Sequence, residues 1–564
     1  MKVLGINYLS ESSITLIENG NITFAISQER INRKKNWWGN PIKSINFMLK
    51  RKKLKLRDID YISTHGLIGE KNQKLIPSSS NFEAKRIEVI KSSLSKDQKR
   101  KQINFLNLRE NHEAKVCFRT QKILKHLRKL RKKLFIYDHH KCHASSAYYF
   151  SGWKNCYVLT MDGWGDDSSS KFYKVNDNNF KLLSSSCTLD SIGYFYGSIT
   201  KLLGFKPHQH EGKVLGLAAF GDPTVAYKDI SKMISFDSLS NSFKGHYEKG
   251  IYQAKFENKN LNFLLKKYSK KDIAAATQKR LEDVVTLFIN KNLPKKSKIA
   301  LAGGIFANVK LNQKISENKL VEEIFVFPNM GDGGLSTGAA ALKYFEIRKY
   351  SPKRIKNMNL GPSFSNLDIL KEIRKNKLNY IKIENPESFI AHQLKKGKII
   401  GLFQGKMEFG PRSLCNRSIL VSAEDKKINN RLNKKLNRTE FMPFAPIILQ
   451  TEAKKYFLSI NSKKSCGDFM TSTFKCKKRC LKDFPAAVHV DQTARPQFIN
   501  KDNKIIYEIL NYYYKLTGSP AIINTSFNMH EEPIICSPAD AIRAFKLGKL
   551  DYLFIGEYII PKSQ

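Results

Sequence analysis

Hydrophobic residues along this chain fall into short runs separated by polar turns, a pattern that predicts alternating strands and helices. Near the start, apolar-rich runs at residues 14–17 and 22–26 flank the pair Asn19-Gly20. Both central positions of a tight hairpin favour residues that tolerate a positive φ, as Asn and Gly do. We therefore predict two strands joined by a hairpin turn within the first 30 residues.

The chain becomes polar and basic between residues 67 and 133 and gives no clear strand signal there. Within this part, apolar residues at near-helical spacing over 122–134 alternate with Lys and Arg. Such a helix is typical of a solvated surface, and a helix that binds nucleic acid or a membrane is the alternative. Beyond it, strand and helix signals alternate over 134–222 and 298–345, and 225–296 is mostly helical.

A Lys- and Asn-rich stretch that contains Pro352 and Pro362 separates these signals from a further alternating set. Alternation of strands and helices is typical of α/β folds. We predict an α/β protein with a domain at 1–350, a linker region at 351–384 and a second α/β domain at 385–564.

The composition excludes several classes of protein. The chain has 564 residues, of which 41% are hydrophobic and 26% charged, as in ordinary globular proteins. Disorder is therefore excluded as the main state, and no apolar run has the about 18 residues of a membrane helix. The nine Cys form no regular framework, and the first residues lack the apolar core of a secretory signal. We expect a cytoplasmic protein.

The charge is unusual, because 98 Lys and Arg residues stand against 50 Asp and Glu, a formal net charge of +48. One interpretation is a polyanionic partner, since Lys and Arg that neutralise phosphates release counterions. The other is a genome rich in Lys, Asn and Ile codons, which gives a solvated basic surface. The excess is spread along the whole chain, so we favour the second interpretation. Anionic small substrates such as nucleotides also fit.

The segment 138–143 carries metal-binding residue types at a suitable spacing. Asp138 can cap a helix, and His139 and His143 then lie one turn apart on one helical face. Two imidazoles so placed can bind one metal ion. The zinc-protease pattern requires Glu directly after the first His, and His140 stands there instead, so a metalloprotease is disfavoured.

Three turns directly follow predicted strands; two of them combine Asp with Gly, and the third is rich in Gly. They contain Asp162-Gly163, Gly303-Gly304 and Asp332. Ligands of α/β folds bind at the carboxyl ends of strands, and Gly lets the backbone approach a phosphate. Each turn alone is equally consistent with a simple reversal of the chain. Together with the two histidines, the three turns predict phosphate and metal binding.

Two further segments give weaker signals. The first starts at His210 and contains Lys213, which can neutralise a nucleotide phosphate, among small residues; alone, it fits an ordinary helix start equally well. The second contains Cys466, Cys476 and Cys480, whose spacing fits no standard zinc pattern. We expect no metal at these cysteines.

The C-terminal half contains Arg412 and Arg417 within a segment rich in Gly, Pro, Asn and Ser. The guanidinium fork suits phosphate and carboxylate, so these residues indicate a shaped anion pocket. Arg438 and Arg495 can add to it, and 524–528 supplies amides and hydroxyls after a predicted strand. Basic residues occur throughout the chain, but these arginines lie outside the Lys runs, so we favour a pocket.

With these segments in order, the chain resembles the NodU/CmcH/TobZ family of O-carbamoyltransferases over essentially its whole length. So many long matches in the order of the family are not expected by chance. The most specific matches are residues 138–149, 210–221, 301–315, 327–340, 407–418, 443–446, 489–495 and 524–533.

The resemblance implies two domains and two half-reactions. The N-terminal domain is expected to have an actin/sugar-kinase-like fold, built from duplicated ribonuclease-H-like units, and the C-terminal domain a YrdC-like fold. The YrdC-like domain forms carbamoyl-adenylate and pyrophosphate from carbamoyl phosphate and ATP. The N-terminal domain then carbamoylates a hydroxyl of a sugar, glycoconjugate or secondary metabolite. We expect neither a nucleic-acid partner nor a membrane span, and a homodimer stays open.

The resemblance also assigns residues. The family's divalent metal, reported as iron, is held by residues that match His139, His143, Asp162 and Asp332, the same set that the spacing indicates. Catalysis is expected to use His139, His143, Arg412, Arg438 and Arg495. The residues expected to bind substrates are Lys35, Lys406, Arg417, Thr493, Asn524, Ser526 and Asn528. The residues expected to bind the nucleotide are Gly163, His210, Glu211, Lys213, Gly303, Gly304 and Asn308.

The sequence departs from the family pattern at a few positions. Relatives carry His-Asp at Ser10-Glu11, Glu-Glu-Arg-Phe at 28–31 and Lys-His at Lys35-Asn36, all assigned to the acceptor-side domain, which leaves the acceptor open. Relatives often carry Arg at Met442, so Arg438 has more weight in the predicted pocket. Two alternatives stay open: a tRNA-modifying or nucleic-acid-binding relative, and a non-catalytic nucleotide-binding relative.

Overall fold

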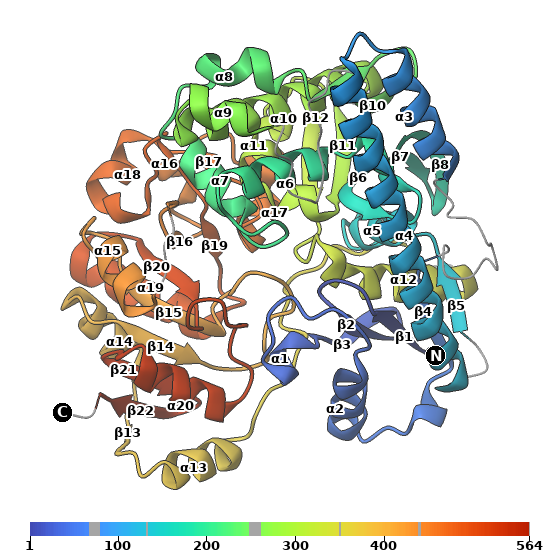
Figure 1. The fold of residues 1–564 in the computed structure, drawn as a ribbon. Helices are drawn as coiled ribbons and strands as arrows, with labels where there is room; N and C mark the ends of the chain where they lie inside the picture. The colour runs from blue at the N-terminus through green and yellow to red at the C-terminus, as the bar shows by residue number, and fades with distance from the viewer. Residues whose placement is uncertain (67–78, 131–133, 247–260, 349–350, 438–440, 563–564) are drawn as a thin grey trace. The chain divides into compact units, whose positions relative to one another are not determined.

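The computed structural model describes residues 1–66, 79–130, 134–246, 261–348, 351–437 and 441–562 (Figure 1). The contacts divide the chain into two compact units. Unit 1 comprises Met1–Asn21, Trp38–Asn40 and Lys55–Ile355, and unit 2 comprises Ile22–Trp37, Pro41–Leu54 and Lys356–Gln564. Both units combine sheets with helices, which confirms the predicted α/β class.

Two five-stranded sheets with the same topology form the framework of unit 1, except that β3 groups with unit 2 from Ile22 onward. Their strand orders are β3-β2-β1-β4-β5 and β8-β7-β6-β11-β12. In the first sheet, β1 pairs antiparallel with β2 and parallel with β4, and β4 pairs parallel with β5. In the second sheet, β6 pairs in the same way with β7 and β11, and β11 pairs parallel with β12. This repeated topology agrees with the duplication that the family resemblance implies. The strands are β1 (Lys2–Asn7), β2 (Ser13–Glu18), β3 (Asn21–Ser27), β4 (Tyr61–His65), β5 (Leu134–Tyr137), β6 (Asn155–Gly165), β7 (Ser168–Asn176), β8 (Asn179–Cys187), β11 (Ser297–Ala302) and β12 (Val321–Val326).

The helices that matter most for the site are α5 and α12, which pack against each other, with α12 also against β1 and β4. A small ribbon of β9 (Ile234–Asp237) and β10 (Ser242–Gly245) completes the strands of this unit. Its helices are α3 (Ser79–Lys91), α4 (Lys96–Leu130), α5 (His139–Tyr149), α6 (Ile192–Leu202), α7 (Glu211–Ala218), α8 (Pro223–Ile230), α9 (Asn262–Lys267), α10 (Lys270–Asn292), α11 (Val309–Ser316) and α12 (Leu335–Ile347).

Local signals in the sequence account for several of these elements. The predicted hairpin is confirmed: Asn19 and Gly20 have φ values of 50° and 76° and join β2 to β3. The predicted basic helix lies in α4, which ends at Leu130, and Leu134 already begins β5. In the part of the chain that the structure describes, no helix has both the length and the apolarity needed to cross a membrane.

Unit 2 is built around one eight-stranded sheet of order β13-β22-β21-β14-β15-β20-β16-β19. A large apolar cluster of buried residues packs on this sheet. The strands are β13 (Ile381–Lys382), β14 (Ile400–Phe403), β15 (Arg417–Ser422), β16 (Ala445–Leu449), β19 (Gln497–Ile499), β20 (Ala521–Ser526), β21 (Tyr552–Ile555) and β22 (Tyr558–Pro561), with a separate pair β17 (Phe474–Lys475) and β18 (Thr493–Ala494). The helices are α1 (Glu29–Asn32), α2 (Ile42–Lys52), α13 (Asn366–Lys375), α14 (Pro386–Lys395), α15 (Ile428–Lys435), α16 (Ala453–Tyr456), α17 (Lys464–Phe469), α18 (Lys478–Asp483), α19 (Lys504–Thr517) and α20 (Pro538–Leu547).

The stretch that we expected to be a linker contains ordered structure. Ser365 and Asp368 form a reciprocal capping box that starts α13. Ile369 and Ile373, four residues apart on that helix, are buried in the core of unit 2. Residues from Lys356 onward therefore count as part of unit 2 by their contacts.

Candidate metal centre and anion-binding edge

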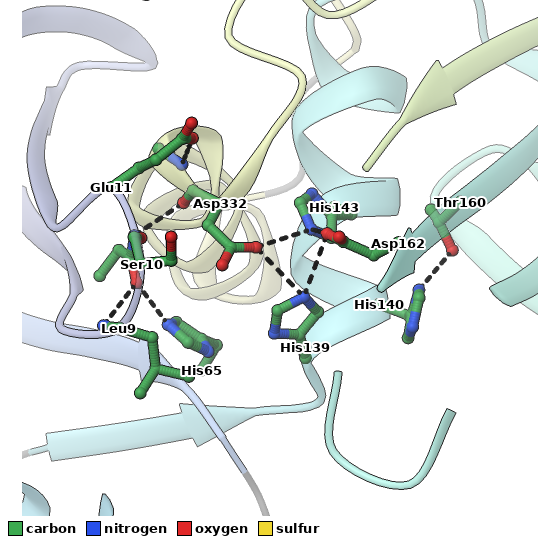
Figure 2. Close-up of polar contacts among 12 residues, drawn as sticks. Leu9, Ser10, Glu11, His65, His139, His140, His143, Thr160, Asp162 and Asp332 are labelled. Atoms are coloured by element: carbon green, nitrogen blue, oxygen red, sulfur yellow. Dashed lines mark hydrogen bonds and ion pairs between the residues drawn. The ribbon is translucent and has the colours of Figure 1, made fainter. Parts of the chain in front are cut away.

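Two histidines project from the start of α5, directly after strand β5 (Figure 2). Asp138 begins the helix, because its carboxylate accepts a hydrogen bond from the backbone N–H of Lys141 at 2.7 Å. The Nζ of Lys171 lies 2.6 Å from the same carboxylate and fixes the cap. His139 and His143 then stand one turn apart, and their side chains are 2% and 0% exposed.

Two aspartates from distant segments complete the cluster. Asp162 lies in β6, and Asp332 begins a short 3-10 turn after β12. The Nε2 of His143 is 3.1 Å from Oδ2 of Asp162 and 3.7 Å from Oδ1 of Asp332. The Nε2 of His139 is 3.8 Å and 3.6 Å from the same two oxygens. One ligand atom from each of the four residues lies within 4.8 Å of every other, a space that one metal ion fills.

The electrostatics of this cluster indicate a cation. Burial and the charge of Asp162 raise the pKa of Asp332 well above its usual range. Burial opposes ionisation of Asp162, but its interactions with the neighbouring His139 and His143 outweigh burial and hold its pKa well below the usual range. Within the described residues, Nε2 of His139 and Oδ1 of Asp332 are buried without a hydrogen-bond partner. Two imidazoles and two carboxylates suit a divalent transition metal, which would satisfy these atoms.

Glycines make room for the cluster. A Cβ at Gly165 would lie 2.2 Å from Cδ2 of His139, and a Cβ at Gly304 would lie 3.1 Å from Oδ1 of Asp162. Gly303 has a φ of 106°, which side chains rarely adopt. The backbone N–H of Gly163 donates to Oδ1 of Asp162 at 2.6 Å. The three glycines that we predicted to bind a nucleotide thus surround the metal-ligand candidate Asp162.

A second layer behind the cluster was not predicted from the sequence. The Oδ1 of Asn7, the last residue of β1, is 2.8 Å from Nε2 of His65 and also accepts the backbone N–H of Leu9 at 3.0 Å. Its Nδ2 donates to the backbone oxygens of Ser10 at 2.7 Å and Asp332 at 2.8 Å. These contacts fix the orientation of the amide, so the Nε2 of His65 must carry the proton.

His65 ends strand β4 and lies directly beside His139. The two rings meet edge to face with centroids 5.3 Å apart, and Tyr8 stacks on His65 at 5.1 Å. Burial, and then the charges of His139 and His143, lower the pKa of His65 well below its usual range, so its imidazole is neutral. Asn7 and His65 lie at the carboxyl ends of β1 and β4, where α/β sites form, but neither strand was predicted from the sequence.

His140 and Glu11 also lie near the metal-ligand candidates. The ring nitrogens of His140 bond Oγ1 of Thr160 and the backbone oxygen of Ser168, both at 3.0 Å, so this histidine stabilises the packing of α5. Glu11 accepts the backbone N–H of Gly333 at 3.0 Å, next to Asp332. The departure from the family pattern at Ser10-Glu11 therefore lies at the cluster (Figure 2).

Other predicted nucleotide-binding residues meet around Tyr196 and Gln278. The hydroxyl of Tyr196 donates to Oε1 of Gln278 at 3.1 Å, and Nδ2 of Asn308 donates to the same oxygen at 2.8 Å. Burial, and then the charge of Glu211, raise the pKa of Tyr196. Burial also raises the pKa of Glu211 itself. The remaining predicted residues at the start of α7 are His210, half-buried, and Lys213, buried.

In unit 2, most of the predicted anion-binding residues gather at one edge of the sheet. The register places the carboxyl ends of β14 and β20 beside the amino ends of β15, β16 and β19. Arg417 begins β15, and Asn524 and Ser526 end β20. The β14–β15 loop carries Arg412, and Arg495 lies two residues before β19. Segments more than 100 residues apart thus converge, as the pocket hypothesis requires.

Arg417 differs from our prediction of a substrate contact. It is fully buried, and its guanidinium donates to the backbone oxygens of Gln404 at 2.5 Å, Asn416 at 3.0 Å and Gly405 at 3.3 Å. It also stacks on Phe403 at 3.7 Å, and burial lowers its pKa to about 10. Arg417 therefore stabilises the β14–β15 loop from within, because its donors are directed at that loop's own carbonyls.

Glu408, which we did not predict, organises the same loop. Its Oε1 accepts the backbone N–H groups of Leu414 at 2.8 Å, Asn416 at 2.7 Å and Arg417 at 3.1 Å. Its side chain is buried. No local pattern distinguishes this glutamate in the sequence, since all three bonds depend on the closed shape of the loop.

The remaining predicted substrate residues occupy varied positions. Asn524 donates to the backbone oxygen of Ser413 at 3.0 Å, and Asn528 donates to the backbone oxygens of Met529 and Glu532, both at 2.9 Å. Arg412, Arg495 and Ser526 are half-buried, Thr493 is buried, and Lys35 and Lys406 are exposed. Lys35 and residues 28–31 group with unit 2 by their contacts, whereas we expected them in the N-terminal domain. Arg438 lies outside the described residues.

Two family models match the chain, the carbamoyltransferase N-terminus over residues 2–341 and the carbamoyltransferase C-terminus over residues 391–562. The chain belongs to the carbamoyltransferase family. Members of different degrees of similarity support this. The uncharacterized protein MJ1051 of Methanocaldococcus jannaschii is 35% identical, with 99% of both chains covered. The nodulation protein NolNO of Sinorhizobium fredii is 29% identical, with 98% of this chain and 79% of that protein covered.

A carbamoyltransferase with a named activity is among the relatives. The 3'-hydroxymethylcephem-O-carbamoyltransferase of Streptomyces clavuligerus is 23% identical, with 75% of this chain and 80% of that protein covered. These findings confirm the predicted NodU/CmcH-type family and the carbamoyltransferase activity. Among solved structures, HypF of T. kodakarensis covers 61% of this chain and 48% of its own, with 12% identity and a TM-score of 0.32, too low to support any conclusion.

Proposed function

We propose that this carbamoyltransferase is an ATP-dependent O-carbamoyltransferase with one half-reaction in each unit. Unit 2 forms carbamoyl-adenylate, and unit 1 transfers its carbamoyl group to a hydroxyl of a sugar, glycoconjugate or secondary metabolite. The observation that carries this proposal is the presence of two separate polar sites in a chain that both family models match. One is the cluster of two histidines and two aspartates, and the other is the arginine-containing sheet edge.

The first half-reaction releases phosphate from carbamoyl phosphate and pyrophosphate from ATP. Water releases phosphate from carbamoyl phosphate and leaves carbamate, whose oxygen attacks the α-phosphorus of ATP and displaces pyrophosphate. The chain's contribution is to hold the phosphoryl groups by Arg412 and Arg495 at the sheet edge, where guanidinium groups offset the charge of the reacting phosphates. AMP then serves as a good leaving group on the carbamoyl carbon.

The second half-reaction belongs to unit 1 in this proposal. The acceptor oxygen bonds to the carbamoyl carbon, the bond to the AMP oxygen breaks, and the hydroxyl proton is released. His139, His143, Asp162 and Asp332 would hold a divalent metal, which we propose to be iron and which supplies Lewis-acid polarisation when bound. The glycine turns let the backbone approach the phosphate, and Glu211 and Asn308 offer hydrogen bonds to the nucleoside. Binding both reactants together removes much of the entropic barrier.

The test uses the full chain with labelled carbamoyl phosphate, ATP and a panel of nucleotide sugars. We expect phosphate, pyrophosphate and carbamoyl-adenylate to form, and label to move to an acceptor. His139→Ala should spare pyrophosphate release and abolish transfer, whereas Arg412→Ala should abolish both. Folded protein that releases no pyrophosphate would refute the proposal, and the reverse pattern in the two variants would refute the division between the units.

A second candidate, a tRNA-modifying or nucleic-acid-binding relative, is favoured by one observation, the net charge of +48. A mobility shift with tRNA that persists at physiological salt would support it. A non-catalytic nucleotide-binding relative is favoured by the departures from the family pattern at Ser10, Asn36 and Met442. ATP binding without turnover on any acceptor would support this alternative.

A further inference from the structure

A segment near the N-terminus supplies a buried arginine to the loop that carries Arg412. Arg30 lies in α1, belongs to unit 2 and has a side chain that is 6% exposed. Its Nη2 donates to the backbone oxygen of Gly410 at 2.9 Å, and its Nη1 is 3.2 Å from Oε1 of Glu29. Glu29 in turn accepts the backbone N–H of Asn36 at 2.6 Å. Glu29 therefore fixes the Arg30 guanidinium, and the guanidinium in turn binds the loop at Gly410.

The Gly410 carbonyl lies between two other points at which the loop is held. Before it, the backbone N–H of Phe409 donates to the oxygen of Met358 at 2.8 Å. After it, Glu408 binds three backbone N–H groups between residues 414 and 417. Gly410 itself has a φ of 141°, a conformation that only Gly adopts readily. Arg412 follows two residues later in the same loop, and only Pro411, whose ring restricts the backbone, stands between them.

Arg33, from the same segment, also donates to backbone oxygens of unit 2. Its Nη1 and Nη2 donate to the backbone oxygens of Ile534 and Pro533, both at 2.7 Å, and its Nε is 3.5 Å from Asp540. With Arg417, three guanidinium groups of unit 2 are thus directed at backbone carbonyls around the sheet edge. Their donors are used to support the backbone, and Glu29 and Asp540 lie beside the charges of Arg30 and Arg33.

We propose that Arg30 is a positioning residue for Arg412 in phosphoryl binding, although it is encoded in the N-terminal part of the chain. The proposal rests on the proposed function, in which Arg412 binds carbamoyl phosphate or ATP. It gives residues 28–36 a role in forming carbamoyl-adenylate and removes them from acceptor recognition.

The test compares Arg30→Gln and Arg30→Lys in the full chain with a control, Lys34→Gln. Lys34 lies in the same segment, is exposed and contacts the Trp37 ring at 5.6 Å. The probes are carbamoyl phosphate and ATP, each titrated by calorimetry, together with steady-state pyrophosphate release. Arg30→Gln should raise Kd and KM for at least one probe about tenfold or more, because a charged hydrogen bond to the loop is lost. Arg30→Lys should give Kd and KM values between those of Arg30→Gln and the wild type, since one ammonium group cannot bind both the Gly410 oxygen and the Glu29 carboxylate. Lys34→Gln should have the same Kd and KM values as the wild type.

The outcomes separate positioning from general stability. A fall in kcat and in thermal midpoint with unchanged KM and Kd would make Arg30 merely structural and would overturn the proposal, as would wild-type constants in Arg30→Gln. If the wild type binds both probes but releases no pyrophosphate, the proposed function fails, and the Kd values still decide the role of Arg30. If the folded wild type binds neither probe, both proposals fail.

Discussion

At the scale of single residues, adjacent side chains of α5 have different roles because a helix turns each to a different neighbour. His139 and His143 face the two aspartates, whereas His140 is buried between Thr160 and Ser168. The i and i+4 spacing was therefore informative. The sequence could not reveal Asn7, His65 or Glu408, since their roles depend on contacts made only after distant segments fold together.

The space at Gly165 yields a residue-scale prediction. Gly165→Ala should lower the affinity for Co²⁺ about tenfold or more, because the new methyl group must displace the His139 ring and misplaced ligands bind metal weakly. Co²⁺ absorption titrations measure this affinity. Gly212→Ala is the matched control, since a Cβ there has no atom within 4 Å. Equal affinity in both variants would contradict the placement of His139.

The fixed tautomer of His65 yields another prediction. His65→Ala should weaken Co²⁺ binding about tenfold to a hundredfold, as loss of outer-layer support commonly does. His65→Gln should stay within a few-fold of the wild type, because its amide N–H can replace the Nε2 donor to Asn7. The same absorption titration applies. Similar losses in the two variants would show that ring packing on His139, rather than the hydrogen bond, is what matters.

At the scale of elements, the sequence was most informative where caps and periodicity act locally. The hairpin at Asn19-Gly20 and the cap at Asp138 were predicted from such signals and are present. The stretch around α13 was misleading because its many Lys and Asn residues resemble a linker, while two isoleucines four residues apart are enough to bury the helix. Arg417 was misleading for a related reason: sequence shows a guanidinium but not where its donors point.

The contact between α8 and α9 gives a prediction on pH. Asp229 at the end of α8 bonds Lys232 at 2.8 Å, Lys267 at 3.1 Å and the hydroxyl of Tyr268 at 2.8 Å. Burial opposes its ionisation, but these partners outweigh burial and lower its pKa to about 2. The folded pKa is depressed, so the stabilisation is present above the unfolded pKa of about 4 and disappears as pH falls toward 2.

Asp229→Asn should therefore lower the free energy of unfolding by about 1 kcal/mol at pH 7, a value reduced for the exposed lysine partners. The difference from the wild type should shrink between pH 4 and pH 2 in urea titrations. Glu322→Gln, which removes an exposed carboxylate 3.7 Å from Lys298, is the control and should change stability by less than about 0.5 kcal/mol at every pH. If Asp229→Asn changed the free energy of unfolding equally at every pH, the lowered pKa of Asp229 would be refuted.

At the scale of the whole molecule, the net charge of +48 affects any binding measurement. If the excess is a solvated surface, tRNA should bind only weakly, and its mobility shift should vanish by about 150 mM salt, as unspecific phosphate contacts do. Pyrophosphate release should change far less over the same range if, as we propose, the half-buried Arg412 and Arg495 bind small anionic substrates at the sheet edge. A shift that survives at this salt concentration would instead favour a nucleic-acid substrate.

The division of the chain into units has a practical consequence for engineering and for evolution. Because Ile22–Trp37 and Pro41–Leu54 group with the C-terminal third, a single crossover near residue 350 would separate Arg30 from its partner Gly410. Hybrids of two relatives that keep these contacts must exchange the early segment together with the C-terminal part of the chain. Natural recombinants of related genes should therefore inherit residues 22–54 and the C-terminal part from the same parent.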